Sequence, residues 1–154
     1  MIVVFGDEQD EPVAADEMVR LAEVVMIAEG LDADTGVSIT LVDEDTIALL
    51  NRKHMGKAGP TDVLSFPIED AAPGAPPRRT VDGPPVEIGD VVIAPSVVRS
   101  NAKRDAVVFE DELALMVVHG MLHLLGWDHV AEAEAVAMER REEELLNLVG
   151  KVRA

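Results

Sequence analysis

A strongly apolar stretch from Leu113 to Leu125, which carries two histidines, constrains the fold of this chain more than any other feature. Acidic residues precede it, as is typical of the first turn of a helix. His119 and His123 lie four residues apart, so a helix presents both imidazoles on one face. Gly126 ends the predicted helix, because glycine readily adopts the left-handed conformation that turns a chain. The pattern predicts an apolar helix with a histidine pair on it and a sharp turn behind it.

That turn can bring a third histidine, His129, to the same point. The spacing His-x-x-x-His-x-x-Gly-x-x-His is that of metzincin zinc sites. Two histidines four residues apart can arise by chance, but a third behind a helix-ending glycine is hard to attribute to packing. The chain has no cysteine, so an ion would have only nitrogen and oxygen ligands. The spacing predicts one divalent ion on His119, His123 and His129, with zinc expected first; nickel, copper or iron also suit three imidazoles.

Gly120 stands where the zinc proteases of this spacing carry a glutamate, the residue that accepts a proton from water. Three protein ligands leave a fourth position for water, as in catalytic zinc sites. The proton must then pass to another base or to the substrate phosphate, unless the hydroxide form of that water acts alone. A zinc peptidase is disfavoured. Phosphodiester cleavage tolerates the missing glutamate better, because a Lewis acid on the phosphoryl oxygen supplies much of the stabilisation.

Three other residues, two of them just before the third histidine, are not assigned to the ion by the motif. Asp128 can either orient a histidine ring or form the turn between two helices, and the sequence favours neither. Trp127 is expected to cover the edge of the site. His54, which lies among basic residues, is expected to be an exposed polar residue at a helix end.

Hydrophobic periodicity predicts an α+β protein in which strands come early and helices late. Expected strands cover 2–5, 37–42, 63–66 and 90–93, and expected helices cover 14–29, 44–54, 95–104, 113–125 and 132–149. The proline-rich segment 71–86 is expected to be a loop or flap. The last helix should turn Val136, Leu145, Leu146 and Val149 inward. The length predicts one domain, residues 1–154, with a small mixed sheet of about four strands packed with about five helices.

The formal net charge of −17 argues against indiscriminate binding of nucleic acid. Residues 52–104 nevertheless hold eight basic side chains against six acidic ones, which could form a local basic patch or simply a solvated surface. No apolar run approaches the roughly 20 residues of a membrane span, and the N-terminus lacks the form of a signal peptide. The expectation is a soluble, cytoplasmic protein.

Three blocks of the sequence together resemble the YbeY family of bacterial metal-dependent endoribonucleases. They are the histidine motif at 119–129, Pro-Thr-Asp-Val-Leu-Ser-Phe-Pro at 60–67 and Gly-Asp-Val-Val-Ile at 89–93, and they occur in the family's order. The resemblance spans nearly the whole chain. It implies a zincin-like fold with one ion, usually zinc, on the three histidines and a strand over Thr61–Phe66 beside the cleft. It also implies cleavage of single-stranded RNA in 3′-end maturation of 16S ribosomal RNA and in ribosome quality control.

The resemblance further implies ribosomal RNA and the small subunit or its assembly factors as partners. Many members have an arginine, assigned to substrate or catalysis, at the position that Met55 occupies here. Arg52 and Lys57 are the candidates to contact phosphate in its place. The alternative function is a ribosome-assembly binding module with a mainly structural ion. An open fourth coordination position would favour the enzyme, and a buried one filled by a protein group would favour the module.

Overall fold

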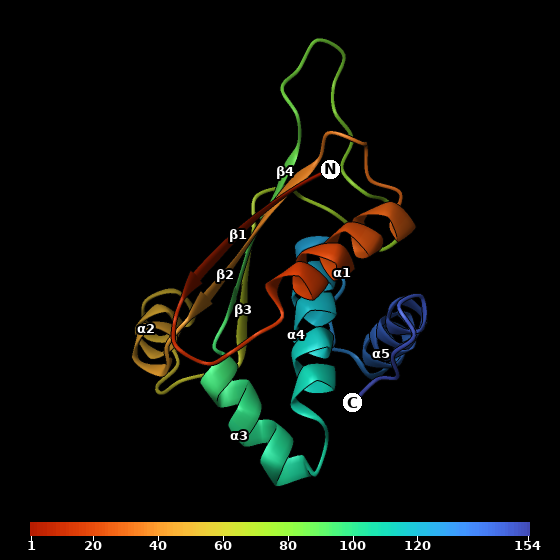
Figure 1. Cartoon of the computed structure of the whole chain (residues 1–154). Helices are drawn as coiled ribbons and strands as arrows, with labels where there is room; N and C mark the ends of the chain where they lie inside the picture. Colours follow the sequence, from red (N-terminus) through yellow and green to blue (C-terminus); the bar gives the residue numbers. More distant parts are fainter.

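Four strands form one mixed sheet in the computed structural model, which describes all residues 1–154 (Figure 1). The strands are β1 (Ile2–Glu8), β2 (Gly36–Val42), β3 (Val63–Pro67) and β4 (Glu87–Ile93), in the spatial order β1-β2-β4-β3. β1 pairs with β2 and β2 with β4 in parallel, whereas β3 runs antiparallel to β4. β3 is therefore an edge strand of opposite direction to the other three.

Five α-helices accompany the sheet: α1 (Ala15–Ala28), α2 (Glu44–Leu50), α3 (Pro95–Asp105), α4 (Phe109–Leu124) and α5 (Glu132–Asn147). A single π-helical turn, η1 (Asn51–Met55), continues α2. The expected N-cap of α2 is present, since the Asp43 carboxylate accepts a hydrogen bond from the Thr46 backbone N–H at 2.8 Å. The predicted α+β class, with four strands and five helices, is confirmed.

α4 is the central helix of the molecule. α1 packs against it on one side, α5 on another, and β3 and β4 of the sheet on a third. Most of its side chains are buried, among them Val117, Val118 and Met121, which are fully so. They join the main hydrophobic core with residues of the sheet, α1 and α5. A helix enclosed in this way has only a narrow strip from which polar side chains can reach solvent.

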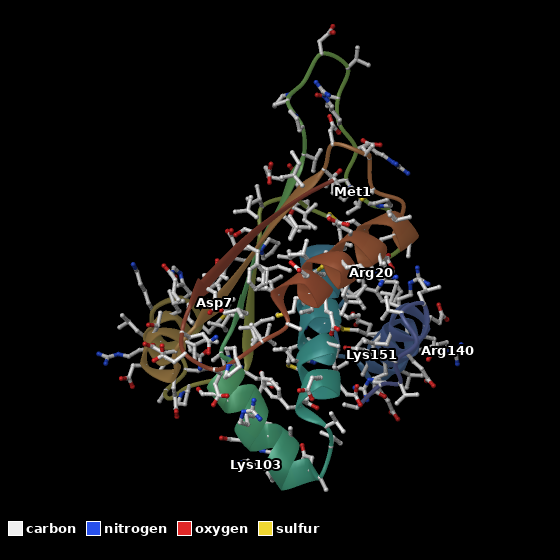
Figure 2. The ribbon with its side chains drawn as sticks, in the orientation of Figure 1. Met1, Asp7, Arg20, Lys103, Arg140 and Lys151 are labelled. Carbon is white, nitrogen blue, oxygen red and sulfur yellow. The ribbon has the colours of Figure 1, made fainter.

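Most charged residues lie on the outside of this assembly, and Glu142 of α5 is the buried exception. Lys103 lies on α3 and Arg140 on α5, and both side chains are exposed (Figure 2). No helix is long and apolar enough to cross a lipid bilayer.

The expected loop at 71–86 is confirmed as largely irregular backbone, with one isolated bridge between Ala72 and Ala75. It projects from the end of the sheet (Figure 1). The segment is attached to the turn before β2, because Arg78 forms an ion pair with Asp32 at 3.1 Å and Arg79 pairs with Asp34.

Two expectations need correction. β1 and β4 are longer than the apolar runs that predicted them, because a parallel ladder pairs backbones whatever the side chain, as at Glu8 opposite Val42.

The inward position assigned to Val136 is wrong, since that side chain is 53% exposed. Met138, two residues on, faces the core instead, and a step of two residues in a helix reverses the direction of the side chain. Leu145 and Leu146 are buried as expected, and Val149 packs partly against the core.

Candidate metal centre

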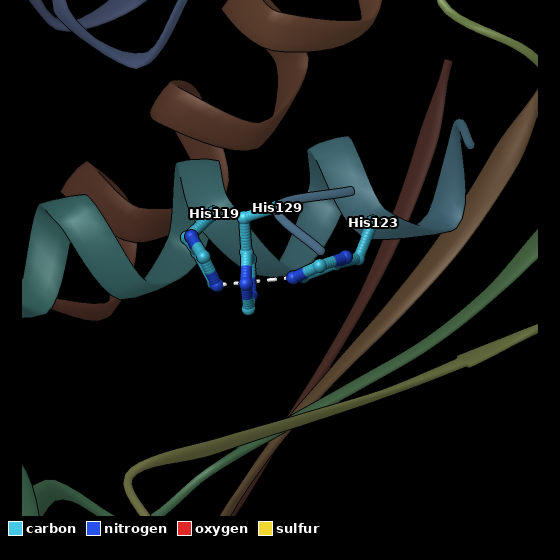
Figure 3. Close-up of side chains that lie close together, drawn as sticks. All are labelled: His119, His123 and His129. Carbon is cyan, nitrogen blue, oxygen red and sulfur yellow. Dashed lines mark hydrogen bonds between the residues drawn. The ribbon is translucent and has the colours of Figure 1, made fainter. Parts of the chain in front are cut away.

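Beyond the first turn of α4, only His119 and His123 are not fully buried, and both side chains lie on one face of the helix (Figure 3). Their ring centroids are 4.6 Å apart, and the two Nε2 atoms approach to 3.1 Å. The predicted helical spacing of four residues therefore brings both imidazoles to one point, as expected.

The third imidazole arrives through a Schellman motif at the end of α4. The Trp127 backbone N–H donates to the Leu122 carbonyl at 3.0 Å, and the Gly126 N–H donates to the His123 carbonyl at 3.1 Å. Gly126 has φ +91°, and a Cβ there would lie 2.1 Å from the Ala71 carbonyl oxygen. Only glycine tolerates both the positive φ and the close approach of Ala71. Gly126 therefore sets the direction of the chain after α4.

His129 follows the turn and is exposed, with its ring centroid 5.4 Å from that of His119 and 5.0 Å from that of His123. One ring nitrogen from each histidine lies within 4.8 Å of the others. Nitrogen ligands about 2.0–2.1 Å from a tetrahedral zinc ion are about 3.3 Å apart. The half-buried pair already has this separation, and only the exposed ring would have to move slightly. The residues present therefore fit a divalent ion that prefers imidazole.

The environment of His123 favours the form that binds metal. Burial lowers the pKa of this imidazole, and positive charge on His119 and His129 lowers it further. A lowered pKa keeps the ring neutral, and a neutral ring has a lone pair to donate.

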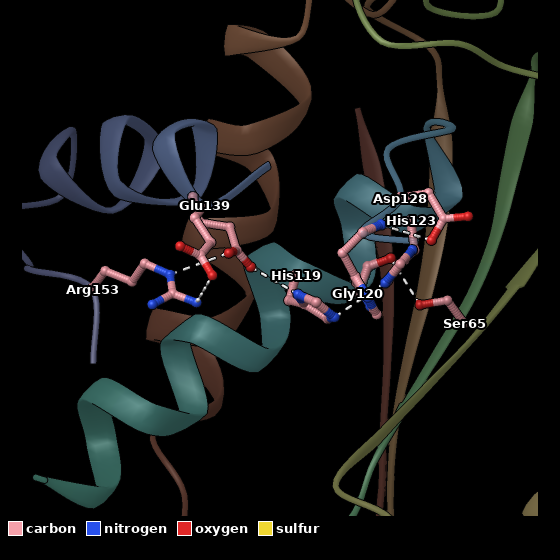
Figure 4. A network of polar contacts seen from close by, with 9 residues as sticks. Ser65, His119, Gly120, His123, Asp128, Glu139 and Arg153 are labelled. Carbon is pink, nitrogen blue, oxygen red and sulfur yellow. Dashed lines mark hydrogen bonds and ion pairs between the residues drawn. The ribbon is translucent and has the colours of Figure 1, made fainter. Parts of the chain in front are cut away.

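A buried carboxylate that the sequence analysis missed contacts His119 and Arg153, which are both labelled in Figure 4. Glu142 of α5 is only 1% exposed, and its Oε2 lies 2.8 Å from Nδ1 of His119. Its Oε1 lies 3.2 Å from Nε of Arg153. The signal was present in the sequence, because Glu142 falls four residues after Met138 and three before Leu145 on the inward stripe of α5.

Gly120 faces the sheet and not the three imidazoles. A Cβ at this position would lie 2.6 Å from Cγ1 of Val91 and 3.3 Å from Oγ of Ser65. The Ser65 hydroxyl donates to the Gly120 carbonyl at 2.8 Å, which joins α4 to β3. The absence of a glutamate here thus has a packing reason: α4 lies too close to the sheet for any side chain.

The remaining residues near the motif have structural roles. Asp128 is exposed, and its carboxylate accepts the backbone N–H of His129 at 2.8 Å, which favours the turn over the orienting role. Trp127 packs partly against the hydrophobic core. His54 is exposed, as expected, and its ring meets that of Phe66 edge-on at 5.1 Å between centroids.

Arg52 and Lys57 do not join the histidine cluster. Arg52 lies in η1 and Lys57 just after it; both side chains are exposed, and neither forms an ion pair. Met55 is also largely exposed, at 42%. The contact of His54 with Phe66 joins this basic turn to β3, the strand that also contacts α4. The turn that carries these cations thus contacts β3, as α4 does, but the cations are not part of the histidine cluster.

The chain is similar to known proteins over nearly its whole length. Residues 5–150 match the family described as Endoribonuclease YbeY. The Endoribonuclease YbeY of Symbiobacterium thermophilum is 40% identical, over 97% of this chain and 92% of that protein. The protein of the same name from Thermobifida fusca is 38% identical, over 95% and 92% respectively.

A solved structure supports the same relationship. The solution structure of TM1509 from Thermotoga maritima matches with a TM-score of 0.60 and 28% identity, covering 97% of this chain and 91% of that one. The sequence match and the shared architecture agree with each other. The chain is therefore a member of the YbeY family of endoribonucleases, hydrolases that cleave RNA.

Proposed function

We propose that this endoribonuclease acts on single-stranded RNA, matures the 3′ end of 16S ribosomal RNA and takes part in ribosome quality control. The observation that carries the proposal is the convergence of three imidazoles from α4 and the following turn, with the third one exposed to solvent. An exposed ligand leaves the site open on one side, as catalysis requires and a purely structural ion does not. The substrate itself is inferred from the family resemblance.

His119, His123 and His129 would hold one divalent ion, with zinc as the first candidate. When bound, such an ion polarises a phosphoryl oxygen and lowers the pKa of a water molecule. Gly120 is packed against β4 and supplies no carboxylate where a zinc peptidase has its base. The proton of an attacking water molecule would then have to pass to another group, such as the RNA phosphate, unless the 2′-hydroxyl of the RNA were the nucleophile.

Arg52 and Lys57 would contact the phosphates that flank the scissile bond. Both are exposed and without an acidic partner, in a protein whose net charge of −17 repels RNA elsewhere. Phosphate contacts supply most of the affinity of proteins for nucleic acid. A few free cations beside β3 would thus confine binding to the side of the molecule that carries the histidines.

We also propose that residues 1–154 act as a single domain in the cytoplasm, on ribosomal RNA and together with the small subunit or its assembly factors. Support for one domain comes from the main core cluster, which contains residues from Met18 in α1 to Leu146 in α5.

A cleavage assay tests the proposal. Zinc-loaded protein is given an RNA that carries the 3′ end of 16S precursor, either single-stranded or annealed to a complementary strand, and the products are mapped. Single-stranded RNA should be cut and the duplex spared. His123→Ala, purified in parallel, should be inactive and so exclude a contaminating nuclease. If His123→Ala cleaves at the wild-type rate, the metal-dependent mechanism is wrong; if duplex and single strand are cut alike, the specificity is wrong.

A further inference from the structure

The geometry points to Glu142 as a positioning residue for the metal ligand His119, with Arg153 holding Glu142 in turn. In this arrangement Glu142 selects the imidazole tautomer in which Nδ1 carries the proton and Nε2 is free to bind the ion. The inference rests on the proposed function, because it requires the metal site on the three histidines.

The burial of Glu142 is the first reason to assign it a specific role. The residue is 1% exposed, on a helix whose other inward residues are Met138, Leu145 and Leu146. A carboxylate removed from water costs free energy unless it is paired and hydrogen-bonded. An apolar side chain would pack at this position without that cost, so the carboxylate is expected to do more than fill space.

The two oxygens of Glu142 have different partners. Oε2 lies 2.8 Å from His119 Nδ1, and Oε1 lies 3.2 Å from Arg153 Nε (Figure 4). Arg153 also approaches Oε1 of Glu139 at 3.9 Å, so this cation lies between two acids of α5. Because the Arg153 guanidinium donates to one oxygen, the orientation of the carboxylate is set and the other oxygen is aimed at His119.

The tautomer follows from the chemistry of the pair. A carboxylate can only accept hydrogen bonds, so the nitrogen of His119 that faces it must carry the proton. The lone pair then lies on Nε2, the atom that is 3.1 Å from Nε2 of His123 and faces the other imidazoles. Metal-binding histidines generally donate their second N–H to such an acceptor, which fixes the ring and increases its basicity.

Glutamine at position 142 separates positioning from packing, because its shape is nearly that of glutamate. Its amide has one oxygen and one NH2 group, whereas Arg153 is a donor and His119 is a donor in the proposed tautomer. Glu142→Gln must therefore lose its contact with either His119 or Arg153. Glu143→Gln is the matched control, since it makes the same change at an exposed neighbour without an ion pair.

The test measures zinc affinity by competition with a chromophoric chelator, without RNA. Glu142→Gln should bind zinc about 10–100-fold more weakly than the wild type, the usual effect of removing such a supporting group. Glu143→Gln should stay within about twofold. If Glu142→Gln binds zinc as tightly as the wild type, the inference is wrong and Glu142 is only structural. If the wild type itself binds no zinc, the proposed metal site fails instead, so the two failures are distinguishable.

A measurement on the wild type keeps the inference testable should Glu142→Gln fail to fold. Nitrogen-15 NMR of the histidine rings in the zinc-loaded protein reports which nitrogen carries the proton and which binds the ion. The expected result for His119 is a proton on Nδ1 and zinc on Nε2. Zinc on Nδ1 of His119 would overturn the inference.

Discussion

At the scale of single residues, the three imidazoles are unequal. His119 and His123 are half-buried on α4, whereas His129 is exposed on a turn. A ligand on a rigid, partly buried element keeps its orientation without the ion, and an exposed one must be ordered by it. The two helical histidines should therefore matter most for affinity.

We expect His123→Ala to lose more zinc affinity than the roughly 10–100-fold of a supporting residue, and to lose RNA cleavage with it. The fold should survive, because the His123 side chain is only half-buried and is not part of the main hydrophobic core. Chelator competition measures the affinity, and circular dichroism checks the fold. Unchanged zinc affinity would remove His123 from the ligand set.

Gly120 is expected to be required for stability. In Gly120→Ala the new methyl group would meet Val91 at 2.6 Å, and overpacking of this kind costs about 1–3 kcal/mol. Urea denaturation measures the loss. The control is Gly6→Ala, where the nearest atom to the new methyl is 3.7 Å away, and the change should be under about 1 kcal/mol. A Gly120→Ala protein as stable as the wild type would contradict the packing reason for this glycine.

At the scale of elements, the first turn of α4 contains Glu112, whose environment disfavours the charged form of the carboxylate. Burial raises the pKa of Glu112 above its ordinary value of 4.5, and the negative charges of Asp62 and Asp105 raise it further. The folded state therefore binds the Glu112 proton more tightly than the unfolded state. The contribution of this proton to the free energy of unfolding is fully present below about pH 4.5. It is lost as the pH rises through the raised pKa of Glu112 in the folded state.

Glu112→Gln imitates the protonated form at every pH, so it should raise the melting temperature at pH 7 and have no such effect near pH 4. Thermal unfolding at the two pH values measures this difference. Glu110→Gln, an exposed change in the same turn, should give no gain at pH 7. A lower melting temperature of Glu112→Gln at pH 7 would mean that its interaction with the helix dipole outweighs its burial.

The turn formed by η1 and the residues after it should act as a phosphate-binding element. Arg52→Ala and Lys57→Ala should each weaken binding of single-stranded RNA and reduce the slope of log affinity against log salt by about 0.7. Lys103→Ala, an equal loss of charge on the outer part of α3, is the control (Figure 2). Salt slopes that match the wild type in both variants would place RNA elsewhere on the surface.

At the scale of the whole molecule, the site joins α4 to α5 through the contact of His119 with Glu142, while the main core is built from apolar residues that need no ion. Zinc at 1,000 times its dissociation constant should stabilise the fold by about 4 kcal/mol. Chelation should lower the melting temperature, abolish RNA cleavage and leave the far-ultraviolet circular dichroism unchanged at 25 °C. Unfolding on chelation would favour the structural ion of a binding module.

The periodic elements and the three histidines that converge follow from the sequence alone. The α4 helix, the glycine turn and the convergence of three histidines follow from local spacing, because helix geometry and a left-handed glycine act within a few residues. The element order was equally readable, apart from the inward face of α5, where Val136 was placed wrongly. That error concerns the face of the helix: Val136 is two residues from the buried Met138, so its side chain points away from the core.

The surroundings of the three histidines depend on the tertiary structure. Glu142 is 23 residues from His119 in sequence. Its spacing from Met138 and Leu145 places it on the inward stripe of α5, but only the packing of α5 against α4 brings it to His119. Gly120 likewise reads from sequence as a missing base, and the sheet behind it explains why no side chain is there. Both depend on contacts between distant elements, which local spacing does not encode. The family match confirms the enzyme class, but the carboxylate behind His119 became visible only in the folded chain.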